Sequence, residues 1–476
     1  MTIWQQNEFV ATLGPNVCRC RFGVLLLSFG CLPVCAQDPP DAEAAIIPAI
    51  ADFQTWNWHA QNTAVLQGDP AFPAIYSGPQ SLINRGEIQE TVTFDLIAGA
   101  RLWPGAEAHA DFLTWWGHGL SKTLGIEAFP NGDAYKAGAG TPNYTFARLF
   151  VRQTVGLGGD KEIVPEDALT LAGQRDVSRL TFTLGRFTPL DICDQNTYAH
   201  DPHTQFFNWA AMANLAWDYG QDTVGYTTGL AIELNQNDWA IRGGFFQIPR
   251  DKNGFTGDDQ VFMWPRRGAF GPFLTSWGSM IEFEKRYHIG LHPGALRFLA
   301  WLDEANFASY NAATEILVAN GPGTDISSAR AHRLKAGLGF NWEQELASGL
   351  GTFARLGWND GHSETWTFTD VNRTASVGIS INGTQWQRPK DTVGFAVVVS
   401  GISQTNQRFL ESGGTDILDG DGALRYGWEQ VLETYYDFRI WNGVHGALDY
   451  QFVANPAFNR DRGPVSVFGA RIHWEY

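Results

Sequence analysis

The stretch Ser466-Val-Phe-Gly-Ala-Arg-Ile-His-Trp-Glu-Tyr476 alternates between apolar and polar side chains. One face carries Phe468, Ala470, Ile472, Trp474 and Tyr476, and the other carries Arg471, His473 and Glu475. Because successive side chains of a β-strand point to opposite faces, this period of two predicts an amphipathic strand. An apolar face that ends in an aromatic residue is rare in a soluble sandwich and suits a strand that faces lipid.

The same alternation recurs upstream, in runs of about ten residues that Gly, Asn, Asp and Pro turns separate. In residues 87–96 the polar face carries Glu87, Gln89, Thr91, Thr93 and Asp95. In residues 145–153 the polar face carries Arg148 and Arg152, and we expect three side chains to point outward: Ala147, Leu149 and Val151. The chain therefore consists largely of amphipathic strands.

A closed barrel is the form in which such strands can lie in lipid, because every backbone polar group must be paired within the protein. The polar faces then need a wet lumen. The 440 residues that follow residue 36, at roughly 25–28 per strand and connection, give around 16 strands. The sequence thus predicts an all-β fold: a transmembrane antiparallel β-barrel of the outer-membrane type, formed by residues 53–476.

The composition excludes other classes of protein. Charged residues make up only 17% of the chain, whereas Gly (52), Phe (32) and Trp (19) are abundant. The mean hydropathy of −0.20 argues against a bundle of membrane-spanning helices, each of which needs about 20 consecutive apolar residues. The net charge of −17 argues against nucleic acid as a partner.

The N-terminal region reads as a signal for export. Arg19 and Arg21 precede the apolar run 22–34, and small residues follow. We expect a cleaved signal peptide at residues 1–36 and a periplasmic leader at residues 37–52. A lipoprotein anchor at Cys35 is less favoured, because Val precedes it. Cleavage would leave Cys193 as the last of five cysteines, too few for an internal disulfide or a metal cluster.

Three long stretches carry a resemblance to a known family. They are Gly185-Arg-Phe-Thr-Pro-Leu-Asp-Ile-Cys-Asp194, Phe353-Ala-Arg-Leu-Gly-Trp-Asn-Asp-Gly-His362 and Asp449-Tyr-Gln-Phe-Val-Ala-Asn-Pro-Ala-Phe458. With their surroundings, from about Trp56 to Tyr476, they resemble the carbohydrate-selective porins of the OprB family. The resemblance implies a 16-stranded barrel in the outer membrane of a Gram-negative bacterium, through which glucose and similar sugars diffuse passively into the periplasm.

Passage of a sugar needs groups on the wall that match hydroxyls and that release the solute again. The alternation places eight arginines in the lumen: Arg148, Arg152, Arg179, Arg242, Arg297, Arg355, Arg439 and Arg471. The acids expected opposite them are Glu107, Asp111, Glu233, Glu282, Asp437 and Asp449. A wet wall also carries salt-bridged charges merely for solvation, so each residue alone is as well explained by that role.

The segment from Asp191 to Trp209 is the best candidate for a loop that folds into the barrel and constricts it. It mixes polar groups for sugar hydroxyls with aromatic faces, among them Asp194, Asn196, Tyr198 and Trp209. An ordered rim loop is the alternative. The Asp and Asn oxygens of the segment would suit Ca²⁺, but the spacing of these residues matches no EF-hand. A hydrolase would pair Asp201 with His200 or His203, yet no nucleophile motif is present.

The sequence therefore predicts a passive pore that is not an enzyme and has no metal or cofactor. A TonB-dependent transporter would need a large plug before the first strand, whereas strand patterning begins near residue 53. The expected partners are sugars, outer-membrane lipid, lipopolysaccharide and the barrel-assembly machinery. The preferred sugar, and the choice between monomer and homotrimer, stay open.

Overall fold

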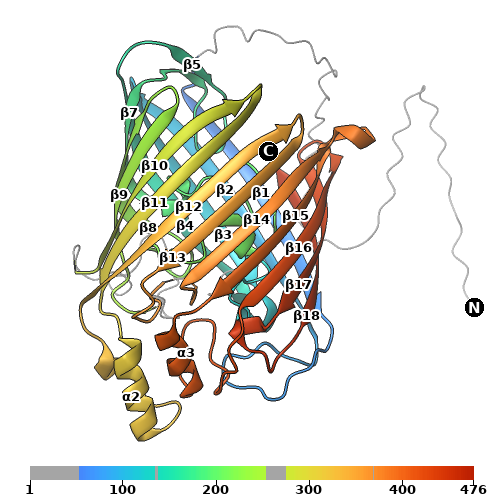
Figure 1. The fold of residues 1–476 in the computed structure, drawn as a ribbon. Coiled ribbons are helices and arrows are strands. Elements are labelled where there is room, and N and C mark those ends of the chain that lie inside the picture. Colours follow the sequence, from blue (N-terminus) through green and yellow to red (C-terminus); the bar gives the residue numbers. More distant parts are fainter. Residues whose placement is uncertain (1–52, 135–137, 253–274, 368) are drawn as a thin grey trace, which may run out of the picture. The chain divides into compact units, whose positions relative to one another are not determined.

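The structure is a computed structural model that describes residues 53–134, 138–252, 275–367 and 369–476. The predicted signal peptide (residues 1–36) and leader (residues 37–52) lie outside the described residues, which begin at residue 53, where the barrel is expected to start. Sixteen of the described strands close into one antiparallel barrel, in which nearly every strand pairs with its neighbours in sequence (Figure 1). The predicted fold class is thereby confirmed.

The barrel strands end where turn residues interrupt the apolar alternation. Their bounds are β1 (Trp56–Asp69), β2 (Glu87–Trp103), β3 (Ala106–Gly117), β4 (Ala139–Gly156), β7 (Arg179–Phe187), β8 (Thr227–Asn235), β9 (Trp239–Gln247), β10 (Trp277–Ile289), β11 (His292–Ala305), β12 (Arg333–Ala347), β13 (Leu350–Asn359), β14 (Arg373–Gly383), β15 (Arg388–Gly401), β16 (Glu429–Trp441), β17 (Val444–Ala454) and β18 (Val465–Glu475). A separate hairpin, β5 (Lys161–Val164) and β6 (Gly173–Asp176), lies between β4 and β7.

A seam between the first and last strands closes the barrel. Gln61 of β1 stands opposite Glu475 of β18, and the two strands stay in register over eight residue pairs. At the end of the seam, Ala60 and Tyr476 exchange backbone hydrogen bonds of 3.2 and 2.9 Å. The barrel therefore has no open edge.

The two ends of the barrel differ in the length of their connections. At one end, the short-turn end, several hairpins need only two residues, and Gly105 and Gly443 take the positive φ (77° and 66°) that such turns require. At the other end, the long-connection end, eight segments join the strands: residues 70–86, 118–138, 188–226, 248–276, 306–332, 360–372, 402–428 and 455–464.

Short helices occur in the long connections. They are α1 (Trp209–Met212), α2 (Tyr310–Asn320) and α3 (Gln404–Glu411), and single turns lie at Leu120–Lys122, Pro189–Asp191, Ser327–Ala329, Thr384–Trp386 and Pro456–Phe458, of which the fourth belongs to the short-turn end. Figure 1 shows α2 and α3 below the barrel and the C-terminus at the opposite end. The long connections bury a shared apolar cluster that includes Phe206, Phe207, Tyr310 and Phe409.

The predicted facing of the final strand is confirmed. Phe468, Ile472 and Trp474 point outward and are exposed, whereas Arg471 and His473 point into the lumen and are each 1% exposed. A charge on the lipid face near the midplane would cost about 2–4 kcal/mol, which explains why the charges lie inside.

The expected outward direction of Ala147 is wrong. Leu149 and Val151 are exposed as predicted, but Ala147 is fully buried inside the barrel. The cause is a β-bulge: Arg148 pairs with Asp111 and Phe146 with Phe112, so Ala147 is an extra residue on β4. A bulge shifts the alternation by one position, which a strict period of two cannot anticipate.

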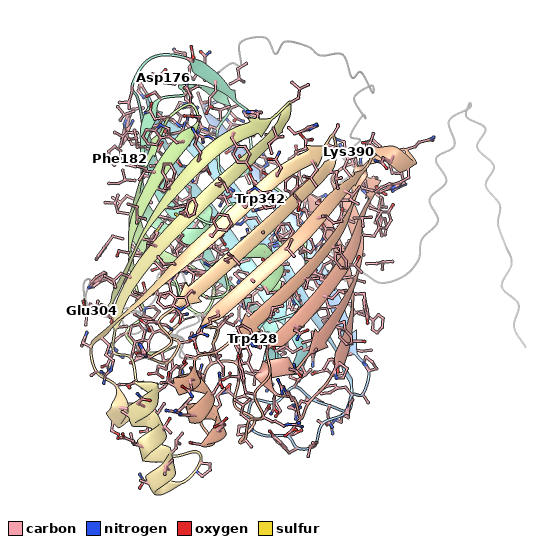
Figure 2. The ribbon with its side chains drawn as sticks, in the orientation of Figure 1. Asp176, Phe182, Glu304, Trp342, Lys390 and Trp428 are labelled. Atoms are coloured by element: carbon pink, nitrogen blue, oxygen red, sulfur yellow. The ribbon has the colours of Figure 1, made fainter. Side chains whose placement is uncertain are left out.

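Exposed aromatic residues gather near the strand ends. At the short-turn end these are Trp56, Trp58, Trp103, Trp441 and Tyr476, and the ring of Tyr476 lies 4.8 Å from that of Trp58. Near the long-connection end they include Trp358 and Trp428. Figure 2 shows Trp428 toward one end of the barrel and Lys390 at the other. Such positions suit the two membrane interfaces.

Candidate functional site

The connection between β7 and β8, residues 188–226, folds back into the barrel, and we call it the inner loop. It begins at Thr188, whose side chain caps the turn Pro189–Asp191. Further along, Phe206 and Phe207 are almost completely buried. An apolar cluster of this kind would be a liability on an exposed rim, and burial against the barrel wall removes it from water. The sequence-predicted segment lies within this loop.

Arg355 on β13 is the main anchor of the inner loop. Its Nε donates to Asp194 Oδ1 at 3.0 Å, its Nη1 to the carbonyl of Ala211 at 3.0 Å and its Nη2 to the carbonyl of Ala199 at 2.7 Å. The residue is only 1% exposed. The hydrogen bonds of this buried guanidinium thus hold the loop rather than meet a solute.

Two residues of β12 hold the next part of the loop. Asn196 Nδ2 donates to Asn341 Oδ1 at 2.8 Å, and Asn341 Nδ2 donates to Asp194 Oδ1 at 2.7 Å. The backbone N–H of Thr197 donates to Glu343 Oε2 at 2.6 Å. The loop and this strand therefore exchange side-chain hydrogen bonds in both directions.

Residues of β16 and β18 hold the far part of the loop. The N–H of Phe207 donates to Glu433 Oε1 at 2.6 Å. Arg471 Nη1 donates to the carbonyls of Pro202 (2.6 Å) and Gln205 (3.0 Å). We give the name anchoring wall to six of the lumen residues that bond to the inner loop: Glu282, Asn341, Glu343, Arg355, Glu433 and Arg471.

Residues 118–134 form a second inner loop, which the sequence did not predict. The carboxylate of Glu429, at the start of β16, accepts from the N–H groups of Glu127 and Ala128 at 3.1 and 2.8 Å. Gln451 Nε2 donates to the carbonyl of Pro130 at 2.8 Å. Backbone groups therefore fix the loop to the wall, together with the side chains of Asn131 and Asp133, which bond to Thr91 and Thr93 of β2.

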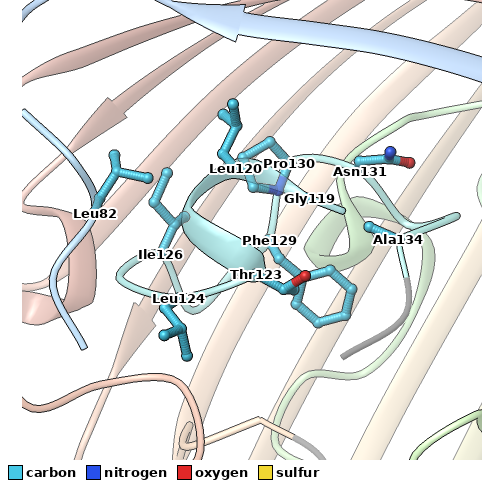
Figure 3. A pocket seen from close by; sticks show the side chains of 10 residues that line it. All are labelled: Leu82, Gly119, Leu120, Thr123, Leu124, Ile126, Phe129, Pro130, Asn131 and Ala134. Carbon is cyan, nitrogen blue, oxygen red and sulfur yellow. The ribbon is translucent and has the colours of Figure 1, made fainter. Parts of the chain in front are cut away.

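The second inner loop encloses a small cavity of about 10 Å³ (Figure 3). Apolar side chains make up most of its lining, among them Leu82, Leu120, Ile126 and Phe129. A space of this size holds one water molecule at most. It is a packing void of the loop and cannot admit a sugar.

The two inner loops meet in the lumen. His203 Nε2 of the inner loop lies 3.1 Å from Asp133 Oδ1 of the second inner loop. The rings of Trp209 and Phe129 stack with their centroids 5.4 Å apart. An ion pair, an aromatic stack and hydrogen bonds such as that from the N–H of Gly132 to the carbonyl of Phe207 (2.6 Å) thus join the loops.

A larger cavity of about 550 Å³ lies between the inner loops and one side of the barrel. The strand residues that line it are Gln61, Asp95, Ile97, Arg148, Phe150, Arg152, Thr183 and Phe187, and we call them the cavity wall. The loops contribute Asp133, Asp191, His203, Trp209 and Tyr226, and residues 167–170 bound it toward the short-turn end. The volume lies within the range of about 300–1,000 Å³ typical of small-molecule sites.

Arg148 and Arg152 on β4 supply the positive charge of the cavity wall. Arg148 pairs with Asp111 and Asp191, each at 2.8 Å, and lies over the ring of Tyr226. Arg152 pairs with Glu107 at 3.1 Å. Both guanidinium side chains stay about one fifth exposed, at 18% and 20%. They can therefore reach a solute in the cavity while their acids hold them in place.

His203 adds a further positive charge. Burial lowers the pKa of His203, but the hydrogen bond to Asp133 and the charges of Asp133, Asp201 and Asp95 outweigh burial and raise that pKa to about 9. The distance from His203 Nδ1 to Asp201 Oδ1 is 3.6 Å, too long for a good hydrogen bond. A protonated imidazole between two carboxylates forms ion pairs and cannot serve as a general base, which argues against the hydrolase interpretation.

The predicted pathway residues fall into three groups. Those that line the large cavity are Arg148, Arg152 and Trp209, and Glu107 and Asp111 pair with the two arginines. Those that hold the inner loop are Asp194, Asn196 and Arg355. Tyr198 is half-buried on the same loop, packed against the apolar cluster of the long connections.

The remaining arginines lie away from the cavity lining. Arg242 is bound by Glu233, Glu282 and Glu284, with distances of 2.6, 3.0 and 3.1 Å. Arg297 pairs with Glu284 (2.7 Å) and Glu343 (3.2 Å), Arg179 pairs with Glu162 of β5 (3.0 Å), and Arg439 donates to Asn442 near the short-turn end. The charges of Arg242, Arg297 and Arg179 are thus paired within the protein.

The sequence missed several cavity residues. Gln61, Asp95, Asp133 and Tyr226 line the cavity, and only Asp95 stood out beforehand as part of a polar strand face. Asp133 reaches the lumen because the second inner loop folds inward, and no alternation marks that fold. Tyr226 lies before β8 begins, at the end of the inner loop.

No helix within the described residues is long and apolar enough to cross a membrane. The chain matches no curated protein. Among solved structures it is similar to the high-pH structure of Pseudomonas putida OprB, with 15% identity, a TM-score of 0.67 and coverage of 89% of this chain and 94% of that one. The low-pH structure of Pseudomonas putida OprB also matches, with 13% identity and a TM-score of 0.46 over 89% and 93% of the two chains.

Residues 79–476 match the model of one protein family, described as carbohydrate-selective porin, OprB family. That range contains fifteen of the sixteen barrel strands, both inner loops and all but one of the cavity-wall residues. The structural likeness covers the same barrel. The chain belongs to the OprB family of carbohydrate-selective porins, which places it among the transport channels of the Gram-negative outer membrane.

Proposed function

We propose that this porin lets glucose and similar sugars diffuse passively into the periplasm through the large cavity. The observation that carries the proposal is the lining of that cavity: two partly exposed arginines, five aspartates and aromatic rings around about 550 Å³. The long connections would then face the medium and the short turns the periplasm, as in other outer-membrane barrels.

The chemistry of the lining matches a neutral polyol. Arg148 and Arg152 donate hydrogen bonds, Asp95 and Asp133 accept them, and Trp209 offers an apolar face. Each arginine is already paired with an acid. A sugar hydroxyl would therefore take the place of a water molecule beside that pair and would not meet an unpaired charge. Binding of that kind is weak enough for release, which a diffusion channel requires.

Swelling of liposomes that contain the purified protein tests the proposal. We expect rapid entry of glucose, slower entry of larger maltodextrins, and entry of neutral amino acids of similar size that is slower than that of glucose. Equal rates for all solutes of one size would contradict selectivity. Uptake that requires an energised inner membrane would contradict passive diffusion.

A pair of variants assigns selectivity to the cavity. Arg148→Ala/Arg152→Ala should weaken the block of ion current by glucose and shift ion selectivity away from anions. Lys390→Ala is the matched control, because it removes an exposed positive charge at the short-turn end. If the control and the double variant behave alike in planar bilayers, the cavity is not the sugar path.

We also propose that the exposed apolar band contacts outer-membrane lipid and lipopolysaccharide, and that the assembly machinery inserts the barrel by means of its final strand. The exposed aromatic end of that strand, Trp474 and Tyr476, supports this. Deletion of Tyr476 should lower the amount of folded barrel in the outer membrane. Unchanged assembly of the truncated chain would refute the role of the terminal aromatic.

A homotrimer would show as a larger mass in detergent, and a monomer is the alternative.

A further inference from the structure

Three carboxylates meet at the long-connection end, outside the large cavity. Glu127 comes from the second inner loop, Asp370 from residues 360–372 and Asp419 from residues 402–428. All three side chains are buried, with 0% exposure. One carboxylate oxygen from each lies within 4.8 Å of the others. Chain segments nearly 300 residues apart in sequence thus bring three acids together.

The hydrogen bonds around these acids leave oxygens without donors. Glu127 Oε2 accepts from the N–H of Asp370 at 2.9 Å, and Asp370 Oδ2 accepts from the N–H of Leu418 at 2.7 Å. By contrast, Glu127 Oε1 and both oxygens of Asp419 have no hydrogen-bond partner in the described part of the chain. A buried carboxylate without donors is costly unless a cation binds it.

The basic side chain that acts on Asp419 is that of Lys252, and other acids already bind it. Lys252 pairs with Asp416 and, at 3.2 Å, with Glu364. None of the ion pairs among the described residues includes Glu127 or Asp419. The surroundings add negative charge, since Glu429 also lies close enough to act on Glu127. Within the described residues, therefore, no ion pair compensates the charge of Glu127 or Asp419.

We propose that Glu127, Asp370 and Asp419 bind a divalent cation, for which Ca²⁺ is the best fit. The donors are oxygens only, which suits a hard cation. Two oxygens bound to one Ca²⁺ lie at most about 5 Å apart, twice the Ca–O distance of about 2.3–2.6 Å. The spacing of the three carboxylates satisfies this limit. The sequence gave no hint of the site, because its members are isolated acids on separate loops.

A cation at this position would tie three long connections together. The second inner loop is one of these connections. Its Pro130, three residues after Glu127, is bonded to the barrel wall, and its Asp133 lines the large cavity. The cation would therefore stabilise the mouth of the pore and fix the loop that carries Asp133. Bound protons are the alternative: burial and the neighbouring Asp370, Asp419 and Glu429 raise the pKa of Glu127 well above its usual range when no cation is bound.

Calcium titration of the full, EDTA-washed protein in detergent tests the proposal. Isothermal titration should show one tight Ca²⁺ site in the wild type, and EDTA should lower its thermal unfolding temperature. Asp419→Asn keeps the shape of the side chain and should weaken Ca²⁺ binding by at least about tenfold. The matched control is Glu411→Gln, which removes an exposed acid from the same connection. It should bind Ca²⁺ as the wild type does.

Glu127→Gln provides a second test in case the first variant folds poorly. It should also lose the tight site, and EDTA should no longer change the unfolding temperature of either folded variant. A wild-type protein that binds no Ca²⁺, with an unfolding temperature that EDTA does not change, overturns the proposal in favour of bound protons. Equal affinity in wild type and Asp419→Asn overturns it as well.

Discussion

The cavity wall and the anchoring wall both carry arginines that face the lumen, yet the side chains of these arginines differ in their exposure to water. Arg152 of the cavity wall pairs with Glu107 and stays 20% exposed, whereas Arg355 of the anchoring wall is 1% exposed and donates to Asp194 and two carbonyls. The difference in exposure depends on whether the inner loop or the large cavity lies beside the arginine. A loop covers one side of the lumen and leaves a cavity along the other.

The comparison teaches that a lumen-facing charge has two possible roles. Where a loop covers the wall, arginine and glutamate act as structural ligands of the loop backbone, as Glu433 does for Phe207. Where the cavity lies beside the wall, arginines such as Arg148 and Arg152 stay partly exposed and can meet a solute. Substitutions on the anchoring wall should therefore act on stability, and those on the cavity wall on transport.

The largest expected effect is that of Arg355→Ala. The change leaves Asp194 buried without its ion-pair partner and frees two loop carbonyls, so the free energy of unfolding should fall by about 3–5 kcal/mol. Release of the inner loop should also raise single-channel conductance. Urea unfolding and bilayer recordings measure the two effects. Wild-type stability together with wild-type conductance would contradict the anchoring role.

A pH change should act on His203, which borders the cavity but also joins the two loops. The pKa of His203 in the folded protein is raised to about 9 from an ordinary 6.5. The stabilisation of the fold by the protonated side chain is therefore fully present below pH 6.5 and is lost as the pH rises to about 9. The loss should reach about 3 kcal/mol, since one pKa unit equals about 1.4 kcal/mol. Anion selectivity should fall over the same range.

His203→Gln is the control for this pH effect. Glutamine can keep a hydrogen bond to Asp133 but carries no charge, so the variant should show neither the stability change nor the selectivity change between pH 6.5 and 9. The two properties are measured by urea unfolding and by reversal potentials at several pH values. A variant that retains the full pH dependence would assign it to another group.

Asn196→Ala should have a moderate effect. It removes the hydrogen bond to Asn341 and the one that Asn196 accepts from the N–H of Tyr198. Neutral hydrogen bonds contribute about 0.5–1.5 kcal/mol each, so we expect a loss of about 1–2 kcal/mol. Denaturant unfolding measures it, and glucose block should stay unchanged. A loss of glucose block at wild-type stability would move Asn196 to the solute path.

The smallest effect on stability is expected for Arg152→Ala. The pair with Glu107 is open to the cavity, and such pairs contribute about 1 kcal/mol or less. The anion-to-cation permeability ratio should nevertheless fall, by up to about fivefold, because one unit charge acts with about 1 kcal/mol at 4 Å in water. Reversal potentials measure this ratio. A large loss of stability would show that the two walls do not differ as described.

The strand pattern of the sequence was enough for the architecture. The alternation in β18 correctly placed Arg471 inside and Phe468 outside, because lipid tolerates no charge on that face. It failed at Ala147, where an inserted residue shifts the alternation. Local periodicity therefore predicts which face a residue occupies until the backbone departs from the regular strand.

The site could be predicted only in part. Arg148 and Arg355 look alike in sequence, since each stands on the polar face of an alternating run. Which of them meets solvent depends on where the inner loop lies, a contact between residues about 160 positions apart. The second inner loop is held in part through its backbone, as at Ala128 and Pro130, and backbone contacts leave no mark in the sequence.

The seam between β1 and β18 sets an order on how the molecule can be made. Gln61 has its partner in Glu475, so the first strand of the barrel waits for the last one to be delivered. Until then any partial sheet has two strands with unpaired N–H and C=O groups, which hydrocarbon cannot solvate. A half-finished barrel is therefore not a smaller pore but an unstable one. Growth in the membrane must proceed with both free edges shielded until a single closing event joins them.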